Sequence, residues 1–453
     1  MHIVLVGAGG TGMSGVAGLL YDLGFQNLIC IDGVQSQLTD KLKEKGLKVI
    51  IGHGNYKVQQ DDKIIYSEAT VESIEVKTAR EIAKKIKRPA FLMNYFQFLG
   101  EISKYFVTVG FAGTNGKSSS SAMAIYTANK VLPNFGLGIL GALVPDFANQ
   151  SYIFNKNFQS DLKNIFDFIF TGKGLNYENI KKHLFLVEAC EYKRHFLHLD
   201  LDYAIITSLE LDHTDYYKDQ KDYDSAFVQL INKVKQNIFV PDNLKLSKFF
   251  DTKKIIKTKI GKINFKKIWG KYNDINGSLV LALLKKLSLS AKKVKNTMLN
   301  FGGLRRRLEL LFTSKKGAII FTDYGHMASS IAGGYETLKQ KYPNKKIICI
   351  FQPHQINRII NGRNDFKKAM KKYDEVIIYD IFAARESLDL AKKMGNFQNL
   401  NDLGNHFARQ GGGIYTTKFE DITKKINNSD KNTVIIIFTA GNLDYKLRNY
   451  YLK

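Results

Sequence analysis

The sequence predicts an α/β protein built from parallel sheets and divided into three segments. Short apolar runs that end in glycine or a polar residue alternate with helical stretches along the whole chain, which is typical of stacked βα units. Three of these runs lead directly into a conspicuous motif, and the motifs define segments at residues 1–103, 104–302 and 303–453. The predicted strands are Ile3–Val6, Leu28–Ile31, Val107–Phe111, Leu184–Val187, Tyr203–Thr207, Ala318–Phe321, Lys346–Phe351, Glu375–Tyr379 and Thr433–Phe438.

The composition is that of an ordinary globular protein with a basic surface. With 453 residues, of which 44% are hydrophobic and 24% charged, the chain can form several cores, and this balance excludes a disordered chain. The formal charge of +25 would suit a polyanionic partner. Most of the cations are lysines spread along the chain, however, so we attribute the charge mainly to solvated surfaces and expect no nucleic-acid partner.

The cysteines and the apolar runs bear on where the protein resides. Cys30, Cys190 and Cys349 lie far apart without metal-ligand spacing, and an odd number of cysteines suits a reducing compartment. The first residues, MHIVLVGAGG, do not have the form of a signal peptide, and runs such as Val434–Ala440 fall short of the about 18–20 residues of a membrane span. We expect a soluble, cytoplasmic protein without membrane contact, either a monomer or a weak homodimer.

The first motif is a glycine-rich turn between a strand and a helix. Gly7, Gly9 and Gly12 have the G-x-G-x-x-G spacing, and Gly10 adds a further glycine. Residues without a Cβ let backbone amides approach a phosphate, and the helix that follows attracts its negative charge. Asp32, at the end of the second strand, could accept a hydrogen bond from a ribose hydroxyl. Alone, the pattern indicates a dinucleotide site, another diphosphate site or a structural turn.

The second motif, GTNGKSS, follows the predicted strand Val107–Phe111 and supplies the parts of a phosphate loop. Backbone amides would cradle the phosphates, Lys117 would reach the terminal ones, and the hydroxyl of Ser118 could ligate Mg²⁺. The strict pattern has glycine where this chain has Phe111, so the loop is a shortened variant. The predicted ATP-binding residues of this loop are Gly113, Thr114, Asn115, Gly116, Lys117, Ser118 and Ser119.

Polar residues at later strand ends could complete this site. Glu188 ends a predicted strand and could hold Mg²⁺, while Asp212 and His213 follow the next one. Parallel sheets collect their ligands at such strand ends, which makes a functional His213 about as plausible as a structural one. Asn273 and Asn276 begin a predicted helix, where they could cap it or recognise a base.

The third segment concentrates arginine, histidine and acidic residues. Arg305–Arg307 is an arginine run in a chain with few arginines, and it is either an exposed basic strand or a phosphate contact. An arginine and a histidine at strand ends suit a small substrate that bears a carboxylate. The residues that the predicted strands bring to their ends are Asp323, Tyr324, His326, His354 and Arg358.

Taken in order, these motifs resemble the Mur ligases, the ATP-dependent amide ligases of peptidoglycan synthesis. The resemblance implies a Rossmann-like N-terminal domain for a UDP-sugar, a central P-loop ATPase-type domain and a Rossmann-like C-terminal domain for an amino acid. It is closest to the branch that joins L-alanine to the lactyl carboxylate of UDP-N-acetylmuramate. The stretches that carry it are GAGGTGMSG, SQLTDKL, GTNGKSS, EACE, ELDHTDYY, NDIN, FGGLRRRLE, DYGH, FQPHQINR and DIFAARE.

The resemblance also implies roles for residues of the central domain. Lys117 and the loop glycines would bind the β- and γ-phosphates of ATP, with Ser118, Glu188 and His213 as ligands of Mg²⁺. Asn276 would hold the adenine. The first glycine turn, with Asp32, would then serve the UDP-sugar rather than NAD.

Further roles fall in the third segment. The resemblance implies that Arg307 reaches the γ-phosphate and that Asp323 belongs to the ATP site. It places Tyr324, His354 and Arg358 around the alanine. Either His354 or His326 could act as the base that deprotonates the amine.

Two departures from the family pattern concern the amino-acid pocket. Met327–Ser330 stands where the family usually has His-Pro-Thr-Glu, and Gln355 stands where it usually has arginine. We expect these changes to affect amino-acid selection and rate but not ATP binding. The alternatives are a muropeptide-recycling or other Mur-type ligase with a different substrate and, less favoured, an NAD-dependent oxidoreductase.

Overall fold

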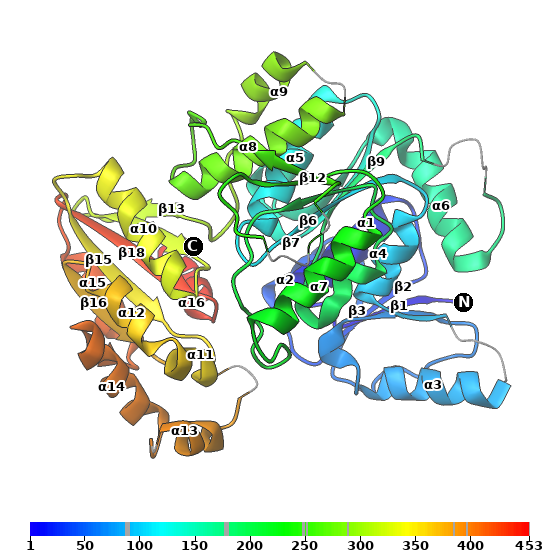
Figure 1. Cartoon of the computed structure of the whole chain (residues 1–453). Helices are drawn as coiled ribbons and strands as arrows, with labels where there is room; N and C mark the ends of the chain where they lie inside the picture. Colours follow the sequence, from blue (N-terminus) through cyan, green and yellow to red (C-terminus); the bar gives the residue numbers. More distant parts are fainter. Residues whose placement is uncertain are drawn as a thin grey trace. The chain divides into compact units, whose positions relative to one another are not determined.

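The computed structural model describes the chain except residues 87–90, 176–180, 247–249, 251, 288–289, 384–385, 396 and 453. The chain forms three sheets in which most strands are parallel (Figure 1). Two compact units contain them: residues 1–267 with 272–303, and residues 268–271 with 304–453. Each sheet lies within one of the three predicted segments, but the predicted boundaries themselves stay predictions.

The N-terminal sheet has five parallel strands in the order β3-β2-β1-β4-β5. The strand order reverses at β1, where parallel sheets commonly bind ligands beyond the carboxyl ends of their strands. Its elements are β1 (Ile3–Val6), α1 (Thr11–Asp22), β2 (Leu28–Asp32), α2 (Gln37–Glu44), β3 (Lys48–Ile51), β4 (Lys63–Tyr66), η1 (Glu68–Thr70), α3 (Ile74–Ile86), β5 (Leu92–Asn94) and α4 (Tyr95–Ser103).

The central sheet has seven strands in the order β12-β11-β10-β6-β9-β7-β8, and only the edge strand β8 pairs antiparallel among the strands described. The strand β6 that precedes the phosphate loop lies near its middle. Its elements are β6 (Val107–Ala112), α5 (Lys117–Val131), β7 (Phe135–Val144), β8 (Gln150–Phe154), α6 (Gln159–Thr171), β9 (Leu184–Glu188), η5 (Tyr192–His198), β10 (Tyr203–Ile206), α7 (Gln220–Lys233), β11 (Ile238–Pro241), β12 (Ile255–Thr258), α8 (Lys271–Lys286) and α9 (Ala291–Met298).

The C-terminal sheet has six strands in the order β13-β14-β18-β15-β16-β17, with β13 antiparallel at one edge. Its elements are β13 (Glu309–Thr313), β14 (Ile319–Asp323), α10 (Ala328–Lys341), β15 (Lys346–Gln352), α11 (Ile356–Asn361), α12 (Arg363–Met370), β16 (Glu375–Tyr379), α13 (Leu388–Gly395), α14 (Leu400–Gly411), β17 (Ile414–Thr416), α15 (Phe419–Asn428), β18 (Thr433–Thr439) and α16 (Leu443–Tyr451).

All nine predicted strands are confirmed, with ends that differ by at most two residues. The stretch 151–182, which carries no recognisable motif, begins within strand β8. This strand packs against helix α1 of the N-terminal sheet. A Cβ on Gly18 of α1 would lie 2.9 Å from the ring of Tyr152, so the glycine makes room for this contact. The hydroxyl of Tyr152 also donates to Asp22 over 2.5 Å.

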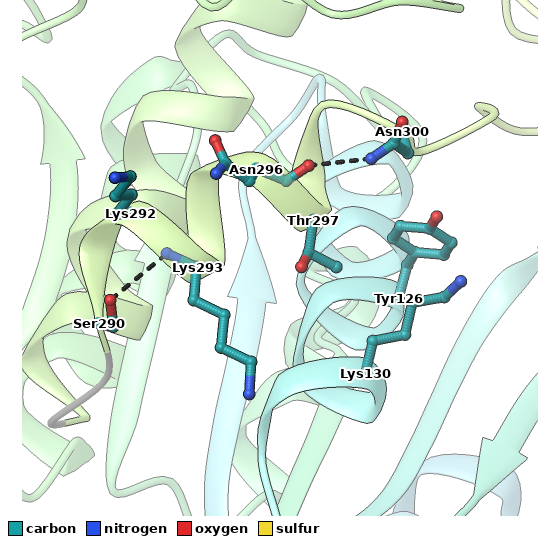
Figure 2. Close-up of a pocket in the computed structure, with 8 residues that line it drawn as sticks. All are labelled: Tyr126, Lys130, Ser290, Lys292, Lys293, Asn296, Thr297 and Asn300. Carbon is teal, nitrogen blue, oxygen red and sulfur yellow. Dashed lines mark hydrogen bonds between the residues drawn. The ribbon is translucent and has the colours of Figure 1, made fainter.

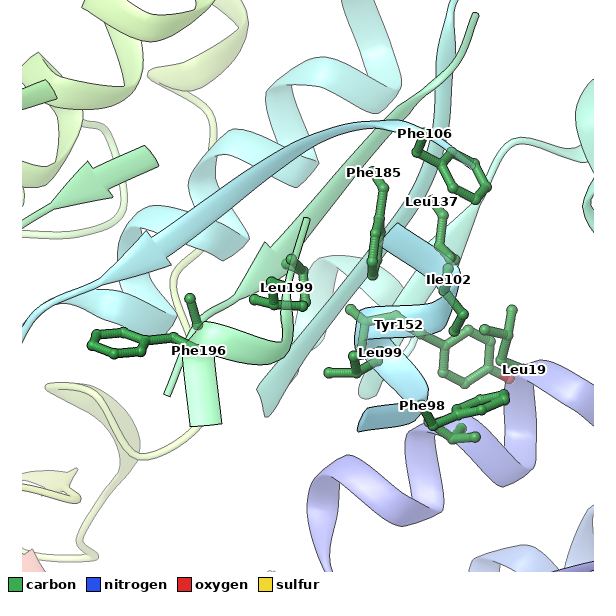
Figure 3. Close-up of a cluster of buried hydrophobic side chains, with 14 of the residues drawn as sticks. Leu19, Phe98, Leu99, Ile102, Phe106, Leu137, Tyr152, Phe185, Phe196 and Leu199 are labelled. Atoms are coloured by element: carbon green, nitrogen blue, oxygen red, sulfur yellow. The ribbon is translucent and has the colours of Figure 1, made fainter. Parts of the chain in front are cut away.

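One apolar core joins the N-terminal and central sheets within the first unit (Figure 3). Side chains of α1, α4, β7 and β9 meet in it and are removed from water, which favours a fixed arrangement of the two sheets. Its members include Leu19, Phe98, Leu99, Ile102, Phe106, Leu137, Tyr152, Phe185, Phe196 and Leu199. Within the described part of the chain, no helix has the length and apolar character needed to cross a membrane.

Candidate active site

The predicted phosphate loop connects the end of β6 to the start of α5. Gly113 and Gly116 have φ values of +117° and +93°, which strongly favour glycine. A Cβ on Gly113 would also lie 2.5 Å from the hydroxyl oxygen of Thr207. Gly116, which offers no side chain, is the N-cap of α5, so the amides of the first helical turn can point at an anion. The loop therefore has the backbone of a phosphate-binding turn.

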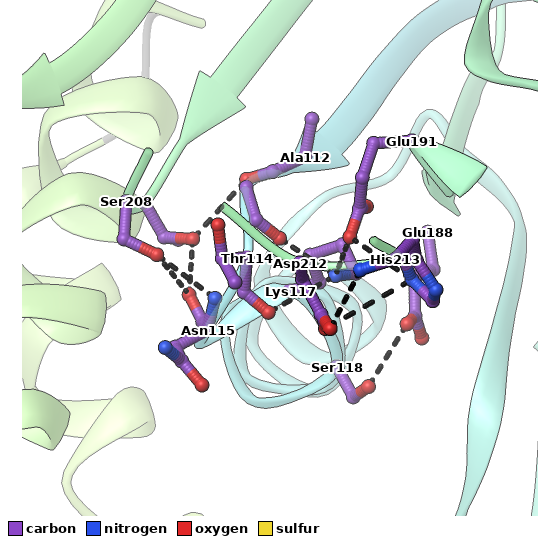
Figure 4. Close-up of polar contacts among 12 residues, drawn as sticks. Ala112, Thr114, Asn115, Lys117, Ser118, Glu188, Glu191, Ser208, Asp212 and His213 are labelled. Carbon is purple, nitrogen blue, oxygen red and sulfur yellow. Dashed lines mark hydrogen bonds and ion pairs between the residues drawn. The ribbon is translucent and has the colours of Figure 1, made fainter. Parts of the chain in front are cut away.

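The ammonium group of Lys117 is held at this loop (Figure 4). Its Nζ donates to the carbonyls of Gly113 and Thr114 over 2.6 and 3.2 Å, and to Oε1 of Glu191 over 2.9 Å. Burial lowers the pKa of Lys117, but the charge of Glu191 and further acidic neighbours outweighs this effect, so the net pKa is raised. Lys117 is therefore a fixed positive charge at the loop.

Ser118 and Glu188 lie together beside Lys117, as their predicted roles require. The hydroxyl of Ser118 donates to Oε1 of Glu188 over 3.0 Å, and the amide of Gly141 donates to Oε2 over 2.8 Å. Hydroxyl and carboxylate oxygens are ligands that Mg²⁺ prefers, so the chemistry of these donors fits that ion. Among the described residues, no three His, Cys, Asp or Glu side chains form a ready metal site.

His213, the third predicted metal ligand, contacts other acidic groups. Its Nε2 lies 3.8 Å from Oε1 of Glu191 and 3.9 Å from Oδ2 of Asp212, and its ring packs on Tyr192 with centroids 4.6 Å apart. The backbone of His213 has a φ of 55°, which is uncommon outside glycine. The role of His213 as a metal ligand stays a prediction.

Asn276 lies inside helix α8 rather than at its cap, because α8 begins at Lys271. Its side chain is buried next to the phosphate loop: a Cβ on Gly116 would lie 2.6 Å from its Oδ1. Capping is therefore excluded for Asn276. Its proximity to the loop agrees with a place in the ATP site, whereas its contact with adenine stays a prediction.

The first glycine turn is closed by Asp32. Oδ2 of Asp32 accepts a hydrogen bond from the amide of Gly9 over 2.7 Å, and Oδ1 accepts one from Val34 over 3.2 Å. Gly7 has a φ of +88°, and the amide of Gly10 donates to its carbonyl over 3.2 Å. Asp32 therefore has a structural task in the turn, whatever it also does for a ligand.

Gly12 permits a close contact between this turn and helix α4. A Cβ on Gly12 would lie 2.8 Å from the ring of Tyr95, the first residue of α4. No sequence motif marks Tyr95 as part of this turn, because its contact with Gly12 arises only from the packing of α1 against α4. Glycine at this position allows the N-terminal turn and the start of α1 to pack closely against α4.

The arginines of Arg305–Arg307 have different surroundings in the second unit. Arg305 pairs with Glu309 over 3.5 Å, whereas Nη2 of Arg306 donates to the carbonyl of Thr439 over 2.5 Å. The guanidinium of Arg307 lies 5.4 Å from the centre of the Tyr324 ring. Arg305 and Arg306 thus have structural partners, and Arg307 packs on another predicted site residue.

Asp323 binds the backbone of two segments, one that follows Arg307 and one that follows Tyr324. Its Oδ2 accepts from the amide of Leu308 over 2.7 Å and its Oδ1 from Gly325 over 2.6 Å. Burial raises the pKa of Asp323, although Arg307 and these hydrogen bonds oppose the rise. Its geometry is that of a residue that orders the loops carrying Arg307 and Tyr324.

The ends of β14 and β15 bring together the residues predicted to face the amino acid. Nη1 of Arg358 lies 3.4 Å from Nδ1 of His354, and the rings of His354 and His326 are 6.1 Å apart. Nδ1 of His326 lies 3.1 Å from the carbonyl of Tyr324. Of the nearby DIFAARE motif, Ala384 and Arg385 lie outside the described residues.

His354 is held in its neutral form. Burial lowers its pKa to about 4, and the positive charges of Arg358 and Arg306 add to this effect. Its ring stacks on Phe382 with centroids 5.7 Å apart. A group with this pKa binds a proton weakly, so it is poorly suited to take one from an ammonium ion. The lowered pKa of His354 therefore argues against this residue as the base and leaves His326 as the candidate.

A basic groove lies between helices α5 and α9 (Figure 2). Its volume is about 640 Å³. Lys130, near the end of α5, lines it, and the 13 helical residues from Lys117 correspond to about 20 Å. The groove is therefore separate from the phosphate loop. Its lining residues are Tyr126, Lys130, Ser290, Lys292, Lys293, Asn296, Thr297 and Asn300.

Comparison with known proteins gives a consistent result over the whole chain. The sequence pattern of the Mur ligase middle domain matches residues 111–279, and that of the Mur ligase family catalytic domain matches residues 2–106. The UDP-N-acetylmuramate–L-alanine ligase of Levilactobacillus brevis is 30% identical over 429 residues, which cover 86% of this chain and 87% of that protein. The enzyme of the same name from Clostridium botulinum is 29% identical and covers 100% of this chain and 97% of its own.

Solved structures confirm the predicted α/β fold. The UDP-N-acetylmuramate-alanine ligase of Thermotoga maritima superposes with a TM-score of 0.71 at 23% identity, covering 99% of this chain and 98% of that one. A murein peptide ligase from Psychrobacter arcticus has a TM-score of 0.63 at 17% identity and covers 100% of this chain and 98% of its own. The three sheets therefore correspond to a known three-domain arrangement.

Proposed function

Because the chain belongs to the Mur ligase family of ATP-dependent amide ligases, we propose that it joins L-alanine to the lactyl carboxylate of UDP-N-acetylmuramate. The choice of substrates is carried by the full-length similarity to curated ligases named for this reaction. The chemistry is supported by the phosphate loop, where Lys117, Ser118 and Glu188 lie together.

A carboxylate is a poor electrophile, so it must be activated before an amine can attack it. In the proposed reaction one oxygen of the lactyl carboxylate attacks the γ-phosphorus of ATP, and ADP leaves. The charge that spreads over the phosphoryl oxygens would be met by Lys117 and by Arg307 from the second unit. Mg²⁺ bound by Ser118 and Glu188 would supply further positive charge at the same oxygens.

The second step forms the amide bond. The amine of alanine attacks the acyl carbon, and inorganic phosphate leaves with the oxygen that came from the carboxylate. The amine must first lose a proton, for which His326 is the favoured base because the pKa of His354 is lowered to about 4. Arg358, beside neutral His354, would bind the carboxylate of the amino acid.

Phosphate release tests this function directly. With UDP-N-acetylmuramate, ATP and Mg²⁺ present, we expect L-alanine to give the highest kcat/KM among the amino acids, with glycine and L-serine within about 200-fold because one small group contributes about 1–3 kcal/mol. Omission of the UDP-sugar is the control. Preference for a peptide would indicate a muropeptide ligase, and reduction of NAD(P)⁺ by a hydroxy acid would contradict the ligase assignment.

A substitution in the first glycine turn should separate the two nucleotide sites. A Cβ on Gly9 would lie 2.8 Å from Oδ2 of Asp32 and break the closure of the turn. We expect Gly9→Val to weaken UDP-N-acetylmuramate binding by about tenfold or more while ATP binding stays unchanged, because a lost charge-assisted hydrogen bond contributes about 1.5–3 kcal/mol. Calorimetric titration with each ligand measures both constants.

The matched control for that experiment is Gly261→Ala. A Cβ on Gly261 meets nothing within 4 Å, so this variant should bind both ligands as the wild type does. Equal loss of ATP and UDP-sugar binding in Gly9→Val would contradict the assignment of the turn to the UDP-sugar.

A further inference from the structure

Glu191 is a buried acid next to the phosphate loop for which the sequence suggested no role. It lies three residues beyond Glu188, just before η5, and its side chain is fully buried. Oε1 lies 2.9 Å from Nζ of Lys117, but Oε2 has no hydrogen-bond partner among the residues that the structure describes. A half-satisfied buried carboxylate weakens a fold, so its presence beside the phosphate loop calls for an explanation.

The contacts of Lys117 show what Glu191 contributes. An ammonium group has three donors, and the acceptors present are the carbonyls of Gly113 and Thr114 and the carboxylate of Glu191. Of these three acceptors only Glu191 carries a charge, and a charge-assisted hydrogen bond is about twice as strong as one to a neutral group. Glu191 is therefore the partner that Lys117 gives up last.

Two buried tyrosines tie Glu191 to the phosphate loop by a second route. The hydroxyl of Tyr217 donates to the backbone carbonyl of Glu191, and its ring meets that of Tyr223 edge to face, with centroids 5.0 Å apart. The hydroxyl of Tyr223 hydrogen-bonds to Oγ1 of Thr114 over 2.8 Å. Glu191 is thus connected to the phosphate loop twice: its side chain contacts Lys117, and its backbone carbonyl is linked to Thr114 through the two tyrosines.

We propose that Glu191 is a positioning residue for phosphoryl transfer: it fixes the ammonium of Lys117 where the terminal phosphates of ATP arrive. When ATP binds, Lys117 exchanges a loop carbonyl for a phosphate oxygen and keeps its contact with Glu191. Glu191 itself touches no substrate. This inference rests on the proposed function, because it assigns Lys117 to the phosphates of ATP.

The test compares ATP with AMP, which lacks the phosphates that Lys117 reaches. In Glu191→Gln the carboxylate charge is lost while the shape is kept. We expect the Kd for ATP to rise about tenfold and kcat to fall about tenfold or more, while the Kd for AMP stays within about twofold. Glu336→Gln is the matched control, because exposed Glu336 pairs with Lys372, just beyond α12, over 2.6 Å, and all three constants should stay near wild type.

The other outcomes would overturn the proposal. Unchanged ATP binding and kcat in Glu191→Gln would show that Lys117 needs no such partner, and tighter ATP binding would show that Glu191 competes with the phosphates. Equal weakening of ATP, AMP and UDP-N-acetylmuramate would indicate a merely structural role. If Glu191→Gln does not fold, Glu191→Asp, which retracts the charge, should also weaken ATP selectively. Wild-type protein that binds no ATP would instead refute the proposed function.

Discussion

Lys117→Ala is expected to abolish turnover while UDP-N-acetylmuramate binding persists. The ammonium of Lys117 lies at the phosphate loop of the central sheet, whereas the first glycine turn belongs to the N-terminal sheet. Loss of this buried charge in the transition state should cost about 3–5 kcal/mol, or two to four orders of magnitude in kcat. Steady-state phosphate release and calorimetry with the UDP-sugar measure the two effects separately.

The same substitution leaves Glu191 buried without its cation. Removing one partner of a buried ion pair is strongly destabilising, so the Tm of Lys117→Ala should fall. The double variant Lys117→Met, Glu191→Gln removes both charges and should recover stability without recovering turnover. Turnover near the wild-type level in either variant would refute the assignment of the phosphate loop.

The second large effect is expected at the amino-acid pocket. Arg358→Ala should raise the KM for L-alanine by about 10–100-fold and leave the KM for ATP within about twofold. The reason is that a guanidinium matches a carboxylate in two parallel hydrogen bonds, made to a group that does not react. Initial rates with each substrate varied in turn give both constants.

Arg363→Ala serves as the control for that measurement. Arg363 is exposed at the start of α12, five residues from Arg358, and its loss should leave both constants unchanged. An Arg358→Ala variant impaired equally toward ATP and alanine would show that Arg358 maintains the fold of the C-terminal sheet instead of binding the carboxylate.

The sequence predicts nine parallel strands, each of which is a largely buried apolar run. It does not predict the other nine strands that the structure describes, β3, β4, β5, β7, β8, β11, β12, β13 and β17. Several of these, such as β3, β5, β12 and β17, are short and partly exposed, and the antiparallel strands β8 and β13 have mixed burial patterns, so their apolar pattern is weak. The same limit applies to Tyr95, which is defined only by its contact with Gly12.

The candidate site likewise contains residues that the sequence predicts and residues that it does not. Lys117, Ser118 and Glu188 lie together, because each stands at a strand end or in a loop with a characteristic motif, and their roles stay predictions. Glu191 carries a sequence signal only in hindsight, as a second acid three residues after Glu188. Arg306 and Arg307 both pack on the ring of Tyr324, but Arg306 also binds the backbone carbonyl of Thr439. This difference depends on the loop conformation and cannot be read from three adjacent arginines.

In the proposed reaction the lactyl carboxylate of UDP-N-acetylmuramate is activated as an acyl phosphate. The most direct measurement uses UDP-N-acetylmuramate whose carboxylate oxygens are a heavy isotope, together with ATP, Mg²⁺ and L-alanine, and follows the released phosphate by mass spectrometry. We expect each inorganic phosphate to carry one heavy oxygen from the carboxylate. Amide formation that releases only unlabelled phosphate would contradict it.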